Sequence, residues 1–246
     1  MNMSTQSTAV PSINITLPRL LVSVRNADEA KIAIDSGVKL LDVKEPAAGS
    51  LGAASLESIG EIADLCPQSV LLSVALGELL DMQQQQLPSG VVPAFAKCGL
   101  SGCRNHPRWT ALWEQQMRNL ATFPVAVVYA DYMRAESPEP KTIVRHAAGN
   151  GCQTVLLDTF DKTGGNLFAH MTHEAIGSWR KGVQAAGMKA VVAGSLDGSM
   201  IAHLLEDGVD CVAVRGAACR GGRSGRLDHN KLTQLVRTAT AVGSPA

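Results

Sequence analysis

The chain has 246 residues, and its 22 lysines and arginines balance its 22 aspartates and glutamates, so its formal net charge is zero. The sequence contains no basic block and no stripe of basic and aromatic residues, which argues against a nucleic-acid partner. No run of about 20 apolar residues occurs, so no membrane span is expected. Hydrophobic residues make up 46% of the chain, which predicts a soluble globular protein with one sizeable core.

The first 18 residues, MNMSTQSTAVPSINITLP, are rich in Ser, Thr, Asn and Pro and lack the basic and long apolar regions of a signal peptide. We expect residues 1–18 to form a disordered leader before a single domain over residues 19–240. The six cysteines are scattered through apolar runs rather than spaced as a disulfide framework, which is typical of thiols in a reducing cytosol. A cytoplasmic protein is therefore expected.

Short apolar runs rich in β-branched residues recur along the chain, and their starts lie 20 to 36 residues apart. Each interval is long enough for a loop and one helix. The predicted strands are residues 20–24, 40–44, 71–75, 94–99, 125–131, 154–159, 190–195 and 211–216.

The segments between these strands have the pattern of amphipathic helices, and most of them stop at a glycine, as a helix C-terminus prefers. Apolar strands alternating with such helices predict a parallel sheet covered by helices. Eight repeats favour a closed (β/α)8 TIM barrel of the α/β class in one domain. No G-x-G-x-x-G motif follows the first strand, which weakens a dinucleotide-binding alternative. Residues 77–92 include four consecutive glutamines and fit either a helix or an open loop. The predicted helices are residues 26–37, 55–67, 141–151, 174–187 and 197–208.

Polar side chains gather at the carboxyl ends of the predicted strands, where the active sites of such barrels lie. Taken singly, each residue also has a structural explanation: a strand-end lysine as a solvated boundary residue, Asp42 as a helix cap, and Arg215 as the partner of a neighbouring carboxylate. Their coincidence at one end of a neutral barrel favours a catalytic site instead. The candidate catalytic residues are Asp42, Lys44, Lys97, Asp131, Asp158 and Lys162.

Lys44 is the candidate nucleophile. Burial at the barrel mouth and neighbouring cations both disfavour an ammonium ion, so they lower a lysine pKa from its ordinary value of about 10.4. A neutral amine adds to a carbonyl carbon and forms a Schiff base without a metal ion or other cofactor. Lys97, Asp131 and Asp158 are the candidates for moving protons.

The loops after the seventh and eighth strands read AGSLDGS (193–199) and RGAACRGGRSG (215–225). In this fold, phosphate commonly docks at these two loops, where glycines allow backbone N–H groups to approach an anion. The expected substrate is therefore a small phosphorylated aldehyde. The candidate phosphate-binding residues are Gly194, Ser195, Arg215 and Gly216.

Several segments are also similar to the (5-formylfuran-3-yl)methyl phosphate synthase family, over about residues 20 to 220. They are DVKEPAAGSLGA, AFAKCGLSG, LLDTFDKTGGNLF, AGSL and CVAVRGAAC, of which the first is the most specific. The resemblance implies that two molecules of glyceraldehyde 3-phosphate condense to a furan aldehyde phosphate in the synthesis of methanofuran-type one-carbon cofactors. It also implies that Lys44 forms the Schiff base, that Lys97 accepts a proton, and that Asp158 and Lys162 belong to the site.

Two other functions stay open for the sequence: a class I-type aldolase acting on another sugar phosphate, and a barrel that binds a phosphorylated metabolite without turnover. Cys98, Cys103 and His106 lack the paired spacing of a structural zinc site, so no metal is expected. A homo-oligomer is an open alternative, because Trp109 and Trp113 would suit an interface, although core packing explains them equally well.

Overall fold

The computed structural model describes residues 16–81, 87–118, 120 and 122–242. Most of the expected leader and all four glutamines of the run at 83–86 lie outside the described residues. Within the described part of the chain, no helix is long and apolar enough to cross a membrane.

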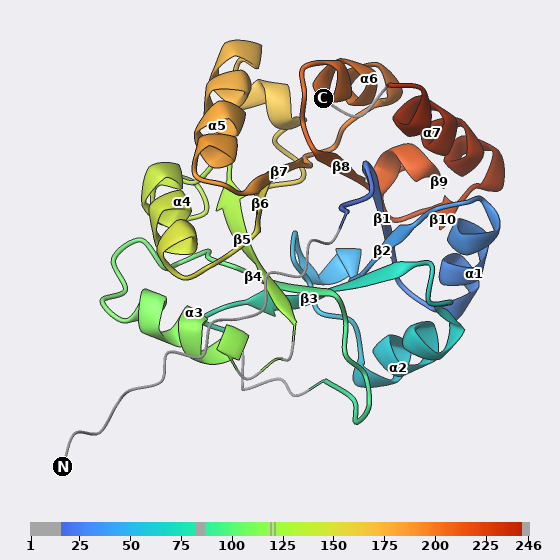
Figure 1. Ribbon diagram of the computed structural model, residues 1–246, viewed down its shortest axis with the longest axis horizontal. Coiled ribbons are helices and arrows are strands. Elements are labelled where there is room, and N and C mark those ends of the chain that lie inside the picture. The colour runs from blue at the N-terminus through green and yellow to red at the C-terminus, as the bar shows by residue number, and fades with distance from the viewer. Residues whose placement is uncertain (1–15, 82–86, 119, 121, 243–246) are drawn as a thin grey trace.

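Eight parallel strands close into one barrel in the order of the sequence, and the first strand pairs with the last. Figure 1 shows the strands at the centre of the molecule with the helices around them. The predicted (β/α)8 barrel is therefore confirmed. The strands are β1 (Leu20–Val24), β2 (Leu40–Val43), β3 (Leu71–Glu78), β4 (Phe95–Gly99), β5 (Phe123–Tyr129), β6 (Thr154–Asp158), β7 (Lys189–Val192) and β8 (Cys211–Val214).

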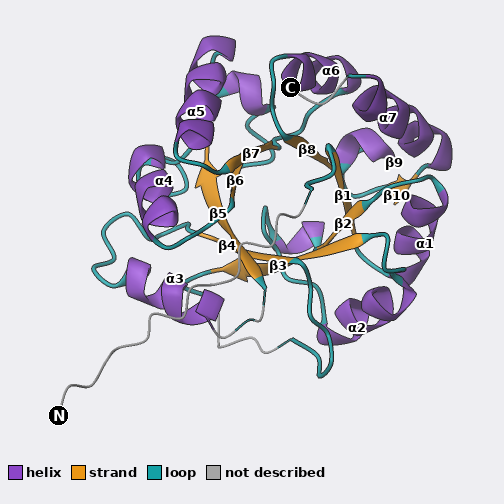
Figure 2. Ribbon diagram, viewed as in Figure 1, coloured by secondary structure: helices purple, strands orange, loops and turns teal. Residues whose placement is uncertain are grey.

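The helices of the described residues form the outer layer (Figure 2). Several begin after a side chain that accepts a hydrogen bond from an N–H group of the first turn, as at Asn26, Ser55 and Thr172. The helices are α1 (Ala27–Asp35), α2 (Leu56–Leu65), α3 (Trp109–Arg118), α4 (Pro140–Gly149), α5 (His173–Ala185), α6 (Gly198–Glu206) and α7 (His229–Ala241).

One β–α unit differs from the expectation of eight complete repeats. Strand β3 continues to Glu78 through a register shift against β4, with Gly77 at a φ of 91°. No helix follows it in the described residues 79–81 and 87–94. The apolar side chains of Leu87 and Val91 pack on the core here instead. An irregular segment therefore covers part of the surface that a helix would cover.

Short elements complete the carboxyl end of the barrel. Three 3-10 turns, η1 (Pro46–Ala48), η2 (Leu167–Ala169) and η3 (Gly216–Ala218), lie in the loops after β2, β6 and β8. The last loop also forms a two-stranded antiparallel hairpin of β9 (Cys219–Arg220) and β10 (Arg226–Leu227).

The apolar side chains form two cores because successive residues of a strand point to opposite faces. The outer core lies between strands and helices and includes Val22, Leu41 and Ile59. The inner core fills the barrel and includes Leu21 and Leu40.

The two tryptophans of α3 take part in packing between helices. Trp113 is 3% exposed, and Trp109 is partly buried against the same core. Both rings form T-shaped pairs with the ring of His146 on α4, at centroid distances of 5.2 Å for Trp109 and 5.6 Å for Trp113. Core packing thus accounts for Trp113 without an interface.

We predict that Trp113→Ala lowers the free energy of unfolding by about 3–5 kcal/mol, because a large buried side chain is lost and a cavity remains. Urea unfolding followed by circular dichroism measures this change. The control is Leu56→Ala, which removes a side chain from a residue that is 50% exposed and should change stability by no more than about 0.5 kcal/mol. Equal losses for the two variants would contradict the assignment of Trp113 to the core.

Candidate active site

A cavity of about 450 Å³ lies at the carboxyl ends of the strands. This volume is within the usual range for small-molecule sites. The barrel brings nine of the ten predicted site residues to this cavity, although they are spread over more than 170 residues of sequence. They are Asp42, Lys44, Lys97, Asp158, Lys162, Gly194, Ser195, Arg215 and Gly216.

Lys44 follows the last residue of β2 and is partly buried. Its backbone N–H donates to the carbonyl of Val24 at 3.1 Å, which extends the pairing with β1 to this residue. Its Nζ donates to the carbonyl of Ser50 at 3.3 Å. Among the described residues, no carboxylate lies within ion-pair distance of the Lys44 ammonium group.

Burial lowers the pKa of Lys44 to about 8. The positive charges of Lys162 and Lys97 act in the same direction, whereas the carboxylates of Asp158 and Asp42 oppose the shift. The free amine is therefore accessible near neutral pH, as the sequence led us to expect for a nucleophile.

Asp42 and Lys97 form a buried ion pair beneath Lys44. The Lys97 Nζ also donates to Ser73 Oγ at 2.7 Å, and Ser73 Oγ donates to Asp42 at 3.0 Å. Ser23 Oγ lies 3.4 Å from the other Asp42 oxygen. Ser23, Asp42 and Ser73 are register partners on β1, β2 and β3, so one layer of the barrel interior holds the carboxylate.

Asp158 and Lys162 form the second ion pair of the cavity, at 2.6 Å. Asp158 also accepts from Ser50 Oγ at 3.0 Å and from the Thr159 N–H at 2.8 Å. Burial alone would raise the pKa of Asp158, but the charges of Lys162 and Lys44 and these hydrogen bonds outweigh it, so the pKa is lowered. Asp158 is therefore an ionised acceptor at neutral pH.

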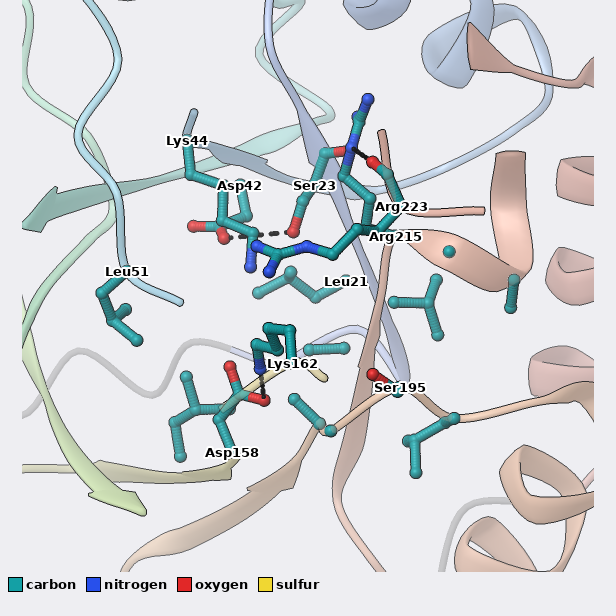
Figure 3. A pocket seen from close by; sticks show the side chains of 18 of the residues that line it. Leu21, Ser23, Asp42, Lys44, Leu51, Asp158, Lys162, Ser195, Arg215 and Arg223 are labelled. Carbon is teal, nitrogen blue, oxygen red and sulfur yellow. Dashed lines mark hydrogen bonds and ion pairs between the residues drawn. The ribbon is translucent and has the colours of Figure 1, made fainter. Parts of the chain in front are cut away.

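The side chains from β2 and those from β6 and its following loop approach the cavity from different sides. Figure 3 shows Asp42 and Lys44 above the cavity, with Asp158 and Lys162 below it. Ser50 joins the two sides, because its carbonyl accepts from Lys44 while its hydroxyl donates to Asp158. The specific GSLGA motif thus holds the candidate nucleophile near the second pair.

The loop after β7 has a backbone that most side chains disfavour. Gly194 has a φ of 111°, and Ser195, which is not a glycine, has a φ of 53°. A Cβ atom on Gly194 would lie 3.0 Å from the Leu167 Cβ and 3.1 Å from the Thr159 Cγ2. Strained backbone of this kind is concentrated at functional sites, and here it lines the cavity.

Arg215, which was predicted as a phosphate ligand, lines the cavity but has its guanidinium held by protein partners. Its guanidinium forms a buried ion pair with Glu29 of α1, with contacts of 2.7 Å and 3.0 Å. It also donates to three carbonyl groups, those of Ser23, Arg223 and Gly225. Pairing with a neighbouring carboxylate, which was the other explanation for this residue, is what the structure shows.

Asp131 is the predicted site residue that does not line the cavity. Its two carboxylate oxygens accept from the backbone N–H groups of Phe160, at 2.7 Å, and Asp161, at 2.9 Å. Asp131 therefore holds the loop that carries Lys162, and the structure does not support its predicted role in moving protons.

Six polar residues in or around the cavity were not predicted from the sequence: Ser23, Glu29, Ser50, Ser73, Asp197 and Arg223. Serines at the same register position of two apolar strands were a usable signal for the carboxylate-binding layer. Glu29 had no such signal, because it occupies one of many acidic positions in a first helical turn.

No three His, Cys, Asp or Glu side chains are placed to hold a metal ion in the part of the chain that the structure describes. Cys98 and Cys103 are buried free thiols beside the core. Burial raises the pKa of both thiols, with that of Cys103 at about 12. Neither thiol is therefore activated as a nucleophile.

Comparison with known proteins assigns the chain to a family. A family model described as 4-HFC-P synthase matches residues 20–236. A relative from Methanocaldococcus jannaschii named (5-formylfuran-3-yl)methyl phosphate synthase is 33% identical over 229 residues, which cover 88% of this chain and 97% of the relative. One of the same name from Methanothermobacter thermautotrophicus is 34% identical, with 88% and 96% covered.

Solved structures with lower sequence identity share the barrel fold. Phosphoribosyl anthranilate isomerase from Thermotoga maritima superposes with a TM-score of 0.65 at 15% identity, covering 92% of this chain and all of the isomerase chain. Thiamine phosphate pyrophosphorylase from Pyrococcus furiosus has a TM-score of 0.58 at 13% identity, with 92% and 97% covered. The family model and the close relatives carry more than the fold: the chain belongs to the (5-formylfuran-3-yl)methyl phosphate synthase family of enzymes, as its sequence motifs predicted.

Proposed function

We propose that this enzyme condenses two molecules of glyceraldehyde 3-phosphate into (5-formylfuran-3-yl)methyl phosphate, with release of one phosphate and two waters, through a Schiff base on Lys44. The observation that carries the proposal is the partly buried Lys44 amine, whose pKa burial lowers to about 8. The names of the relatives support the product. In a cell, the product would serve the synthesis of a methanofuran-type cofactor in the cytoplasm.

The first step joins Lys44 to the substrate. The neutral Nζ adds to the aldehyde carbon of one triose phosphate, and loss of water leaves an iminium ion. The positive nitrogen withdraws electrons and acidifies the hydrogen on the neighbouring carbon. Asp158, ionised and hydrogen bonded to Lys162, is a base that lines the same cavity.

The later steps build the ring. The carbon–oxygen bond to the phosphate breaks by β-elimination, and the electron pair leaves with inorganic phosphate. A proton shift converts the second triose phosphate to its ketone isomer, and the carbon nucleophile, C3 of the first triose, attacks the ketone carbon C2. The hydroxyl on C1 of the second triose then closes the ring on C2 of the first, and loss of two waters gives the furan. Hydrolysis of the Schiff base consumes one water and frees Lys44, so one phosphate and two waters are released overall and no oxidant is needed. In this proposal Lys97 exchanges protons during these steps, and its contacts with Asp42 and Ser73 at the cavity support that role.

A class I-type aldolase would use the same Lys44 chemistry and differs in its product. A furan aldehyde absorbs in the near ultraviolet, whereas a simple aldol product does not. The purified protein is incubated with glyceraldehyde 3-phosphate alone, and absorbance and phosphate release are recorded together. The proposal requires both signals to rise with one phosphate released for each furan. An aldol product that forms without phosphate release would contradict the synthase reaction and support the aldolase.

We predict that Lys44→Met lowers the rate of furan formation by about a thousandfold or more and abolishes the borohydride-trapped adduct, because the nucleophile is lost. Stability should rise by up to about 3 kcal/mol at pH 7, since the charged form of Lys44 is disfavoured in the folded protein at every pH below about 8. The control is Lys39→Met, which removes an exposed lysine next to the other end of β2. Turnover by Lys44→Met at the rate of Lys39→Met would exclude Lys44 as the nucleophile.

The pH dependence of trapping is a separate prediction. A group with a pKa of about 8 is about one-tenth deprotonated at pH 7, so the initial rate of cyanoborohydride trapping should rise through pH 8 and level off above about pH 9. Mass spectrometry of the intact protein after short reaction times measures the adduct. A rate that still rises tenfold per pH unit between pH 9 and pH 10 would show an ordinary, unperturbed lysine.

Lys97 should act after the adduct has formed. The double variant Lys97→Met with Asp42→Asn removes both buried charges together, which avoids an unpaired carboxylate. We predict that it still forms the trapped adduct but produces the furan about 10²–10⁴ times more slowly, because proton transfer is lost. Loss of the adduct in a folded variant would instead place Lys97 in Schiff-base formation.

A further inference from the structure

The arginines of the loop after β8 differ in whether their charge is neutralised. Arg215 has five N–H donors, and five contacts with protein acceptors occupy them: two with Glu29 and three with carbonyl groups. Its charge is paired inside the protein. No donor of Arg215 remains for a substrate.

Arg223 has the opposite situation. It lines the cavity and is partly buried, and its Nη2 donates to the carbonyl of Gly49 at 2.9 Å. Among the described residues, its other N–H groups have no acceptor within hydrogen-bond distance, and no carboxylate pairs with it. A guanidinium at a cavity wall with free donors and no counter-ion is a binding group for an anion, and its planar fork fits phosphate oxygens.

A clamp centred on Glu29 holds the backbone that presents Arg223. Arg215 donates to the carbonyls of Arg223, at 2.9 Å, and Gly225, at 3.1 Å. Arg25 donates to those of Ser224, at 3.4 Å, and Gly225, at 3.5 Å. Both arginines bind the Glu29 carboxylate. Three successive carbonyls therefore face the clamp.

The hairpin that carries Arg223 has a tightly determined backbone. Gly221 and Gly222 have φ values of 81° and 76°, which suit a tight turn. A Cβ atom on Gly225 would lie 1.7 Å from the carbonyl oxygen of Arg220, so the two hairpin segments approach as closely as only glycine allows. The backbone therefore restricts the position of the Arg223 Cα atom.

We propose that Arg223 is the arginine that binds the phosphate of the substrate, and that the clamp of Arg25, Glu29 and Arg215 positions it; this inference rests on the proposed function for the identity of the substrate. Arg223 also touches the loop after Lys44 through Gly49. The enzyme therefore selects phosphorylated aldehydes by one arginine that bridges the phosphate loop and the loop of the nucleophile.

Binding of inorganic phosphate tests Arg223 without any need for turnover. Isothermal titration calorimetry compares the wild-type protein with Arg223→Gln and with Arg226→Gln, which removes the same charge from an exposed position on the same hairpin that does not line the cavity. We expect Arg223→Gln to raise the dissociation constant for phosphate about ten- to a hundredfold, the usual loss of affinity when a charged hydrogen-bonding partner is removed. Arg226→Gln should change it less than threefold.

The positioning role of Glu29 has its own readout. Glu29→Gln should weaken phosphate binding in a protein that circular dichroism shows to be folded. Combined with Arg223→Gln, it should cause no further loss, because Glu29 acts through Arg223. Losses that multiply in the double variant would overturn the positioning role.

The measurements separate this inference from the proposed function. If the protein makes no furan and Arg223→Gln still loses phosphate affinity, the arginine site stands and the reaction assignment fails. If furan forms and Arg223→Gln binds phosphate as Arg226→Gln does, the arginine site is overturned and the reaction assignment stands. Absence of phosphate binding by the wild-type protein at millimolar concentrations would also overturn the site.

Discussion

Three lysines and three aspartates line one cavity, but among the described residues only two of these aspartates pair with a lysine there, and this is the constraint on which the site depends. Asp42 neutralises Lys97 and Asp158 neutralises Lys162, so the third lysine, Lys44, has no ion-pair partner among the described residues. Burial then lowers its pKa to about 8, and the neighbouring ammonium groups assist. In the proposed mechanism, this unpaired lysine is therefore the nucleophile.

The barrel stabilises this arrangement by giving the carboxylate of each ion pair further hydrogen bonds. Ser23 and Ser73, on the strands to either side of Asp42, hold its carboxylate, and Ser50 reaches from the GSLGA loop to Asp158. An ion pair in a dry interior is unfavourable unless such partners are present. Closed strand order brings β1 to β3 together on one side of the mouth and β6 to β8 on the other, so the cavity joins two separately supported charge pairs.

The two arginines Arg215 and Arg223 of the loop after β8 also differ in whether a carboxylate pairs with them. Arg215, whose guanidinium donors are all occupied, is a structural residue, whereas Arg223, with donors to spare, faces the ligand cavity. The two residues belong to one glycine-rich segment, and only their partners distinguish them. Glu29, on a helix near the start of the chain, decides the difference, because it pairs with the Arg215 guanidinium and leaves Arg223 as the arginine with free donors at the cavity.

The sequence by itself determined the barrel, its eight strands and the lysines that line the cavity, because strand patterns and motif residues are local signals. It also placed Lys44 and Asp158 correctly at strand ends. The segment after β3 was ambiguous, because its polar residues favour no period, and the partners that hold Asp131 and Arg215 could not be predicted from the sequence. Only the tertiary structure decided which cations are neutralised, because Glu29 and Arg215 are 186 residues apart and meet only when the barrel closes.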